Sequence, residues 1–154
     1  MKVRDLMTRE VVSVRRETPV NEVARLMHRH GISGVPVMGG DGRLAGIVTE
    51  LDLIVRSGRL DMPVFLQIFD ASIPLELPGH LGSRMRHILG TRAEDVMTPE
   101  VHTVGPEAEV EDLVDLMVRR RVNPVPVIEE DGSLAGIVSR SDLIRKLAAD
   151  LGDA

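Results

Sequence analysis

Apolar residues follow two kinds of spacing along this chain, and each kind occurs twice. The first is the spacing of one helix face, which is shown by two sets of residues: Val20, Val23, Ala24, Leu26 and Met27, and Val110, Leu113, Val114, Leu116 and Met117. Because residues three or four apart share a helix face, each set predicts an amphipathic helix. The second is a pair of short apolar runs around an Asp-Gly turn, at residues 35–38 and 44–48 and again at 125–128 and 134–138. An apolar run on each side of such a turn predicts a β-hairpin.

Two further elements flank each helix and hairpin. A short segment rich in Val and Thr precedes each helix, at residues 11–14 and 101–104, and its composition is typical of a strand. A second helix is expected after each hairpin, because TELD at 49–52 and SRSD at 139–142 both have the form of a capping box. The predicted order in each copy is therefore β-α-β-β-α, which is an α+β arrangement.

The two copies are related by an offset of 90 residues. Residues 5–56 lie over residues 95–146 without a gap, and 24 of these 52 pairs are identical. Each copy is too small to hold much of a core alone, so we expect two units that fold against each other with pseudo-twofold symmetry. A pocket at the interface between the two copies would then occur in two related versions.

Gly31 predicts a left-handed end for the first helix, whereas its counterpart Arg121 predicts a different ending for the second.

The repeat also suggests how the chain is divided. We expect a first unit at residues 1–56, a linker at 57–94 and a second unit at 95–154. The linker matches nothing else in the sequence. Its apolar residues at 64–71 and 83–89 predict two short helices inserted between the units.

Composition narrows the possible functions. The sequence has no cysteine, which excludes disulfides and thiolate chemistry and fits a cytoplasmic protein. A formal net charge of −5 argues against nucleic acid as the main partner, and no apolar run is long enough for a membrane helix. The five histidines lack further ligands at metal-binding spacing, and no catalytic motif occurs, so we expect neither a metal site nor an enzyme.

Short motifs within the repeat resemble a known family. They are DLMT at 5–8 and DVMT at 95–98, the two VPV triplets, and GIVTELDLI at 46–54 with GIVSRSDLI at 136–144. In this order they resemble the CBS domain, named after cystathionine β-synthase, in its usual tandem pair. The resemblance implies two units packed sheet to sheet, with two clefts that bind AMP, ADP, ATP or S-adenosylmethionine in many members. It also implies a homodimer that acts as a sensor, without a required cofactor.

The resemblance further implies that each cleft joins the closing helix of one copy to a wall of the other. Such a cleft suits adenosine, because a carboxylate accepts hydrogen bonds from the ribose hydroxyls and the N–H groups at a helix start attract anions. The residues implied for the first ligand-binding site are Val12, Ser13, Ile32, Ser33, Gly34, Val35, Ser139, Arg140 and Asp142. Those implied for the second site are Thr103, Val122, Asn123, Pro124, Val125, Thr49 and Asp52.

The two sites differ in charge. Arg140 follows Ser139 at the start of one closing helix, whereas Glu50 follows Thr49 at the start of the other. A cation near a phosphate favours binding and a carboxylate opposes it. We therefore expect the site that contains Asp142 to take the more anionic ligand.

Alternatives stay open at this point. Some nucleotide-sensing members of the family carry His or Arg just before the second strand, where this chain has no basic residue at 33, 34, 123 or 124. S-adenosylmethionine therefore stands beside the nucleotides as a candidate ligand. Ser/Thr-x-x-Asp also caps helices in proteins that bind nothing. The alternative function is a ligand-free structural or dimerisation module that acts through a separate protein partner.

Overall fold

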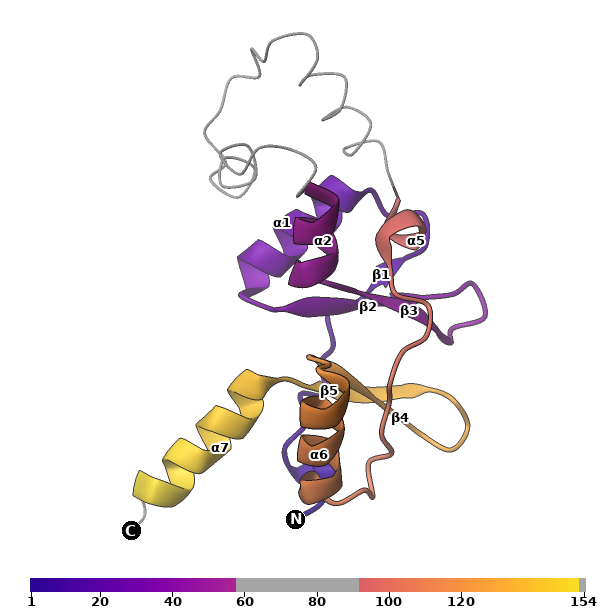
Figure 1. Cartoon of the computed structure of the whole chain (residues 1–154). Coiled ribbons are helices and arrows are strands. Elements are labelled where there is room, and N and C mark those ends of the chain that lie inside the picture. The colour runs from indigo at the N-terminus through magenta and orange to yellow at the C-terminus, as the bar shows by residue number, and fades with distance from the viewer. Residues whose placement is uncertain (58–91, 153–154) are drawn as a thin grey trace, which may run out of the picture.

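The computed structural model describes residues 1–57 and 92–152. Two small α+β units lie with their sheets facing each other and their helices on the outer sides (Figure 1). This arrangement of helices, sheet, sheet and helices confirms the expected fold class. The two short helices expected at 64–71 and 83–89 lie outside the described residues.

The first unit is built on a sheet of three strands. Strand β2 (Gly34–Met38) lies in the middle, parallel to β1 (Val14–Arg15) and antiparallel to β3 (Leu44–Thr49). Helices α1 (Val20–His30) and α2 (Glu50–Ser57) cover the outer face of this sheet (Figure 1). The predicted hairpin and both predicted helices of the first copy are therefore present.

The second unit repeats this plan with one strand fewer. Strands β4 (Val125–Ile128) and β5 (Leu134–Val138) form an antiparallel hairpin, and α6 (Val110–Arg120) and α7 (Arg140–Gly152) accompany it. The second copy's hairpin and helices are thus also confirmed.

The prediction of a first strand at 11–14 and at 101–104 is mostly wrong. Of residues 11–14 only Val14 is in a strand, and of residues 101–104 only Val104 pairs, through a single bridge to Val127. The reason is that both segments connect the two units. Thr8 pairs with Ile137 in one unit before Val14 joins the other, so the residues between them have no strand beside them.

The two units exchange their leading segments. The helical turn η1 (Val3–Asp5) belongs to the first copy, yet Val3 and Met7 are buried in the core of the second unit with Leu113 and Met117. Conversely, α5 (Ala93–Val96) of the second copy is buried in the core of the first unit. The chain therefore crosses between the units twice, and each core contains residues from both copies.

The helices α1 and α6 end in the same way. Gly31 has φ 60° and Arg121 has φ 54°, so both residues adopt the left-handed conformation that closes a helix. The expected ending at Gly31 is confirmed, and the expectation that Arg121 would differ is wrong. Tertiary packing holds the backbone of the two copies alike at a position where only glycine has no steric cost.

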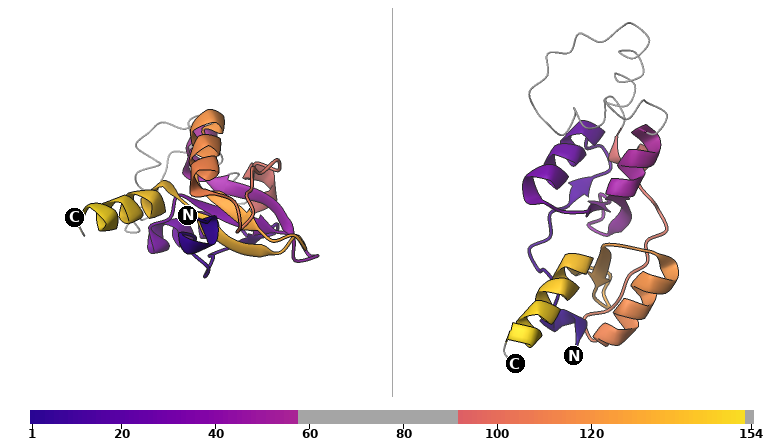
Figure 2. Two further views of the ribbon diagram at one scale, coloured as in Figure 1. Left: turned by 90° about the horizontal axis from the view of Figure 1, so that it is seen from below. Right: turned by 60° about the vertical axis from the view of Figure 1, so that its left-hand side comes forward.

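Helix α7 projects from the second unit (Figure 1; Figure 2, left). It carries three exposed large apolar side chains, Ile144, Leu147 and Leu151, which are 64%, 55% and 69% exposed. Their spacing of three and four places them on one face. No helix in the described ranges is both long enough and apolar enough to cross a membrane.

Candidate functional site

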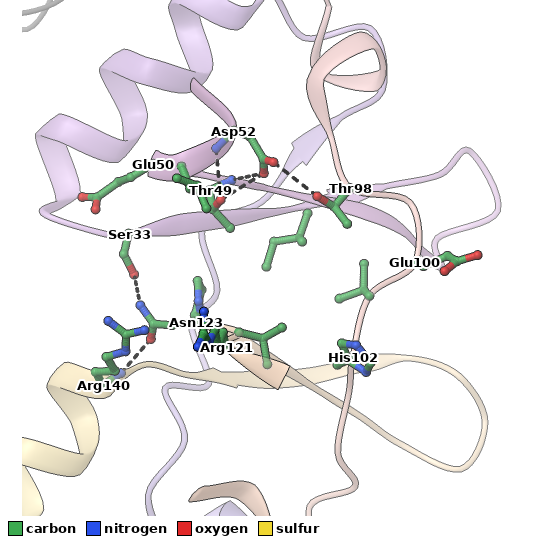
Figure 3. Close-up of a pocket in the computed structure, with 15 residues that line it drawn as sticks. Ser33, Thr49, Glu50, Asp52, Thr98, Glu100, His102, Arg121, Asn123 and Arg140 are labelled. Carbon is green, nitrogen blue, oxygen red and sulfur yellow. Dashed lines mark hydrogen bonds between the residues drawn. The ribbon is translucent and has the colours of Figure 1, made fainter. Parts of the chain in front are cut away.

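A cavity of about 380 Å³ lies between the two units (Figure 3). The first unit contributes Thr49 and Asp52 from the start of α2, together with the apolar side chain of Ile47. The second copy contributes the crossing segment at 98–102 and the segment at 121–124, which connects α6 to β4. The cavity thus depends on both units being in place.

Asp52 is held by hydrogen bonds in the wall that the first unit forms, which is the upper wall in Figure 3. Its Oδ2 accepts hydrogen bonds from the backbone N–H of Thr49 at 2.8 Å and from the Thr49 hydroxyl at 3.0 Å. The Asp52 N–H in turn donates to the Thr49 hydroxyl at 3.3 Å, which completes the predicted capping box. The other oxygen, Oδ1, accepts one long bond of 3.3 Å from the Thr98 hydroxyl. A carboxylate accepts about four hydrogen bonds, so Oδ1 retains room for a donor from a ligand.

Asn123, on the side of the cavity formed by the second unit, forms a hydrogen bond to the first unit. Its amide nitrogen donates to the Ser33 hydroxyl at 3.2 Å, and its amide oxygen accepts from the backbone N–H of Arg140 at 2.8 Å. Ser33 and Asn123 occupy equivalent positions in the two copies, so this contact lies close to the pseudo-twofold axis. It fixes the spacing of the units beside the cavity.

The lower wall is basic. Arg121, Arg140 and His102 all line the cavity from the second copy (Figure 3). Neither arginine forms an ion pair with a carboxylate within the described part of the chain. Glu50 and Glu100 also contribute to the lining, but in Figure 3 their carboxylates point outward at its two edges. In Figure 3 the Asp52 carboxylate lies on the upper side of the cavity, and Arg121 and Arg140 lie on the lower side, with Arg140 at the left edge below Ser33.

The structure brings together most of the second implied site. Thr49, Asp52, Val122, Asn123 and Pro124 line the cavity. The other two residues do not. Val125 is completely buried in the core of the second unit, and Thr103 is exposed outside the lining.

The residues implied for the first site differ in their exposure and surroundings. Ser33 and Arg140 line the cavity that contains Asp52. Val35 is completely buried in the core of the first unit, with Val12 and Ile32 half-buried against that core. Ser13 is exposed, and Gly34 packs so closely against Pro124 that a Cβ atom there would lie 2.6 Å from the proline Cδ. Arg140, the cation that we expected beside Asp142, thus also lines the cavity that contains Asp52.

Asp142 also differs from Asp52 in what its oxygens contact. Its Oδ2 accepts from the backbone N–H and the hydroxyl of Ser139, each at 2.7 Å, which confirms the second capping box. Its Oδ1 forms an ion pair with Arg145 at 3.2 Å, and the residue is only 5% exposed. The position equivalent to Arg145 in the first copy is Val55. Asp142 is thus paired with an arginine of its own helix, whereas Asp52 faces the cavity.

Several lining residues were not found from the sequence. Thr98 ends the DVMT motif, and Glu100, Val101 and His102 follow it. The only available signal was that this motif leads into a connection between the copies. Arg121 was assigned to the end of a helix because its left-handed backbone was not expected. The structure places it both at that helix end and in the cavity lining.

Comparison with known proteins identifies the family. The family model of the CBS domain matches residues 3–58 and 93–149, so the chain belongs to the CBS domain family and carries a tandem pair. The uncharacterized protein MJ1426 of Methanocaldococcus jannaschii is 31% identical over 154 residues, which cover 96% of this chain and 91% of that protein. The chain spans less than two thirds of several longer curated relatives, which it matches over 23% to 57% of their length.

Solved structures share the fold. CBSX2, solved in complex with AMP, matches with a TM-score of 0.71 and 24% identity, covering 96% of each chain. The CBS domain pair of protein MJ0100, solved with 5-methylthioadenosine and S-adenosyl-L-methionine, matches with a TM-score of 0.72 and 19% identity, covering 97% of this chain and 98% of that one. At these identities the likeness establishes the CBS-pair fold.

Proposed function

We propose that this CBS pair is a regulatory module that binds an adenosine-containing ligand in the cavity between its units. The observation that carries the proposal is the position of Asp52, whose Oδ1 faces a cavity of about 380 Å³ closed on the other side by the second copy. Two neighbours of the same fold were solved with adenosine compounds, namely CBSX2 with AMP and MJ0100 with 5-methylthioadenosine and S-adenosyl-L-methionine. They support the class of ligand and leave its identity open.

The lining offers a partner for each part of adenosine. Asp52 accepts hydrogen bonds from the two ribose hydroxyls, as carboxylates do for vicinal hydroxyls. The apolar side chains of Ile47, Val101, Val122 and Pro124 provide flat contacts for the adenine ring. The sequence led us to expect the more anionic ligand at the site that contains Asp142. Because Asp142 already forms an ion pair with Arg145, we now propose Asp52 as the main ligand site.

Regulation would follow from linkage between the units. A ligand that contacts both walls stabilises one relative orientation of the units, and a separate effector protein binds according to that orientation.

We further propose that the module is a homodimer in the cytoplasm. The apolar face of α7, with Ile144, Leu147 and Leu151, supports a second copy as its partner because three large apolar side chains there are more than half exposed.

Thermal unfolding and calorimetric titration with AMP, ADP, ATP, adenosine and S-adenosylmethionine test the proposal. A bound ligand at 100 times its dissociation constant adds about 2.7 kcal/mol to the free energy of unfolding. Asp52→Asn should abolish this gain for every adenosine compound. Asp142→Asn is the matched control, because it disturbs the same capping box in the other copy and should leave binding intact.

A different result would favour the alternative function. If no adenosine compound changes the unfolding midpoint at millimolar concentration, the module does not sense this class of ligand. The exposed face of α7 would then support a purely structural role in dimerisation.

A further inference from the structure

We propose that Arg43 forms an electrostatic latch between the turns of the two hairpins and holds the two units at their present separation. The two turns are residues 39–43 in the first unit and residues 129–133 in the second. The inference goes beyond the proposed function, because it concerns how the units are held together and requires no ligand.

The first argument is the position of the Arg43 side chain. A Cβ atom at Gly132 would lie 3.0 Å from the Arg43 Cζ and 3.6 Å from its Nη2, so the guanidinium group packs directly against the turn of the other unit. The turns of the β2–β3 and β4–β5 hairpins lie on the same side of the molecule (Figure 1; Figure 2, left). Arg43 therefore connects the two units at a place where their backbones are not joined.

The second argument is the charge of the two turns. Residues 129–131 of the second turn are Glu-Glu-Asp, whereas the equivalent residues 39–41 of the first turn are Gly-Gly-Asp. Arg43 thus contacts a turn that carries three carboxylates. The pKa of Asp131 is lowered, mainly by its hydrogen bonds to Ser133 and in part by the positive charge of Arg43. A guanidinium group on one turn and carboxylates on the other attract each other across the gap between the units.

The third argument is the place of this contact along the hairpins. Strand β2 pairs with β3 from Gly34 at the open end of the hairpin to Met38 beside its turn, and β4 pairs with β5 in the same way. The hydrogen bond between Asn123 and Ser33 joins the units at the open ends. Arg43 joins them at the turns, which lie about 13 Å further along because each of four strand residues advances the chain by about 3.3 Å. The facing hairpins are therefore held at both ends.

The two contacts respond differently to salt. The contact of Arg43 is between exposed charged groups, so salt screens it, whereas the hydrogen bond between Asn123 and Ser33 involves no charge. Loss of the Arg43 contact should let the turns separate while the open ends remain joined. The relative orientation of the units is also the quantity on which the proposed regulation depends, so the latch is a second control of that orientation.

The experiment measures the distance between the two turns in the full chain by double electron–electron resonance. The sequence has no cysteine, so spin labels attach only at Gly40→Cys and Glu130→Cys, which are equivalent positions of the two turns. A Cβ atom at Gly40 meets nothing within 4 Å and Glu130 is exposed, so both labels fit. We expect one narrow distance distribution at low salt. It should shift to longer and broader distances at about 1 M salt, where charges are screened beyond about 3 Å.

The informative variant is Arg43→Ser, which introduces the residue that the second copy has at this position. Ser133 holds its own turn by hydrogen bonds to Asp131, so a serine can hold the first turn in the same way while the guanidinium group is removed. At low salt this variant should show the longer distances that the unchanged protein shows at high salt, and added salt should have no further effect. Arg120→Ser is the control, because it removes the same charge from the exposed end of α6 and should leave the distance unchanged.

A second pair of labels separates movement of the units from fraying of the turn. Glu17→Cys with Gly40→Cys places both labels in the first unit, and Glu17 is exposed. Neither Arg43→Ser nor salt should change this distance. An equally large change in this pair would show that the turn itself moves, and the latch would be rejected.

The latch is also rejected if salt and Arg43→Ser both leave the distance between the turns unchanged. The salt series on the unchanged protein needs no substitution at Arg43, so it tests the latch even if the variant does not fold. None of these outcomes depends on a ligand. The proposed function therefore stands or fails separately, in the titrations with adenosine compounds.

Discussion

At the scale of single residues, two methionines and two glycines hold the crossing segments against the strands. A Cβ atom at Gly46 would lie 2.5 Å from Met97 Sδ and 2.9 Å from the Thr98 carbonyl oxygen. That carbonyl accepts a hydrogen bond from the Ile47 N–H at 3.0 Å, so the backbones are fixed at this distance. Gly136 has the same relation to Met7 and Thr8 in the other unit. Glycine is required at both positions because two backbones meet there.

Gly46→Ala should therefore destabilise the protein by about 1–3 kcal/mol, which is the usual cost of overpacking a well-packed site. The bridge between Ile47 and Thr98 has to open to admit the methyl group, and Thr98 is the residue that donates to Asp52. Chemical denaturation of the variant measures the loss. Gly40→Ala is the control, because a Cβ atom there meets nothing within 4 Å, and it should change stability by less than about 0.5 kcal/mol.

If Gly46→Ala and Gly40→Ala were equally stable, the close contact between β3 and the crossing segment would not exist in solution. The exchange of segments described above would then lose its most direct support. Equal stability of the two variants is thus an informative result for the fold as well as for the residue.

At the scale of elements, an electrostatic contact fastens the leading segment of the first copy to the second unit. Lys2 Nζ lies 2.5 Å from Glu109 Oε1, and the N-terminal ammonium lies 3.2 Å from Glu109 Oε2. The hydrogen bond from Lys2 holds the pKa of Glu109 below its usual value, and the same bond raises the pKa of Lys2. Glu109 immediately precedes α6, so this contact ties the start of the chain to the start of that helix.

The lowered pKa of Glu109 predicts a dependence of stability on pH. A carboxyl whose pKa is lower in the folded state stabilises the fold above its unfolded pKa, and this contribution is lost as pH falls through the folded pKa. Glu109→Gln should thus lower the midpoint of thermal unfolding at pH 7 and have no effect well below pH 4. The effect is small and weakens with salt, because the pair is half exposed.

Thermal melts of both proteins between pH 3 and pH 8 measure this difference. Glu130→Gln is a suitable control, since Glu130 is exposed in the hairpin turn of the second unit and is not one of the residues that form this contact. A constant difference between Glu109→Gln and the unchanged protein at every pH would contradict the assignment to an ion pair.

The sequence predicted most helices and strands correctly. It did not predict that each copy contributes its first segment to the core of the other unit. Helix spacing, Asp-Gly turns and capping boxes are local signals, and they placed α1, α2, α6, α7 and both hairpins correctly. The segments at 3–7 and 93–97 each precede one copy, and tertiary packing decides which of the two cores each segment joins. Val3 and Met7 would fit either core equally well by hydrophobicity, because both cores consist of Val, Leu, Met and Ala.

The same distinction explains the outcome at the candidate site. Asp52 was found because it lies in the repeated capping motif next to a predicted helix, whereas Asn123 was implied by the family resemblance. The basic wall was missed because Arg121 breaks the rule that glycine ends such a helix, and tertiary packing overrode that preference. Arg140 was found but assigned to the other cleft, since the sequence does not show which way a side chain points at a helix start.

At the scale of the whole molecule, helix α7 connects the cavity to an exposed apolar face. Arg140, which lines the cavity, is the first residue of α7, and Ile144, Leu147 and Leu151 follow along that helix. If α7 carries the contact between two copies, binding at the cavity and assembly share one rigid helix. A ligand that repositions Arg140 would then be sensed at the dimer interface.

The homodimer proposed on this basis can be tested with one surface change. Leu147→Lys places a charge in the centre of the apolar face of α7 and should shift the protein from twice the chain mass of 16.9 kDa to a monomer. Light scattering after size exclusion measures the mass. Ala149→Lys is the control, because Ala149 is exposed two residues further on and points to another side of the helix, so it should leave the dimer intact. A monomer from the unchanged protein at high micromolar concentration would reject the dimer, and the ligand signal would then have to reach an effector through a surface of the single chain.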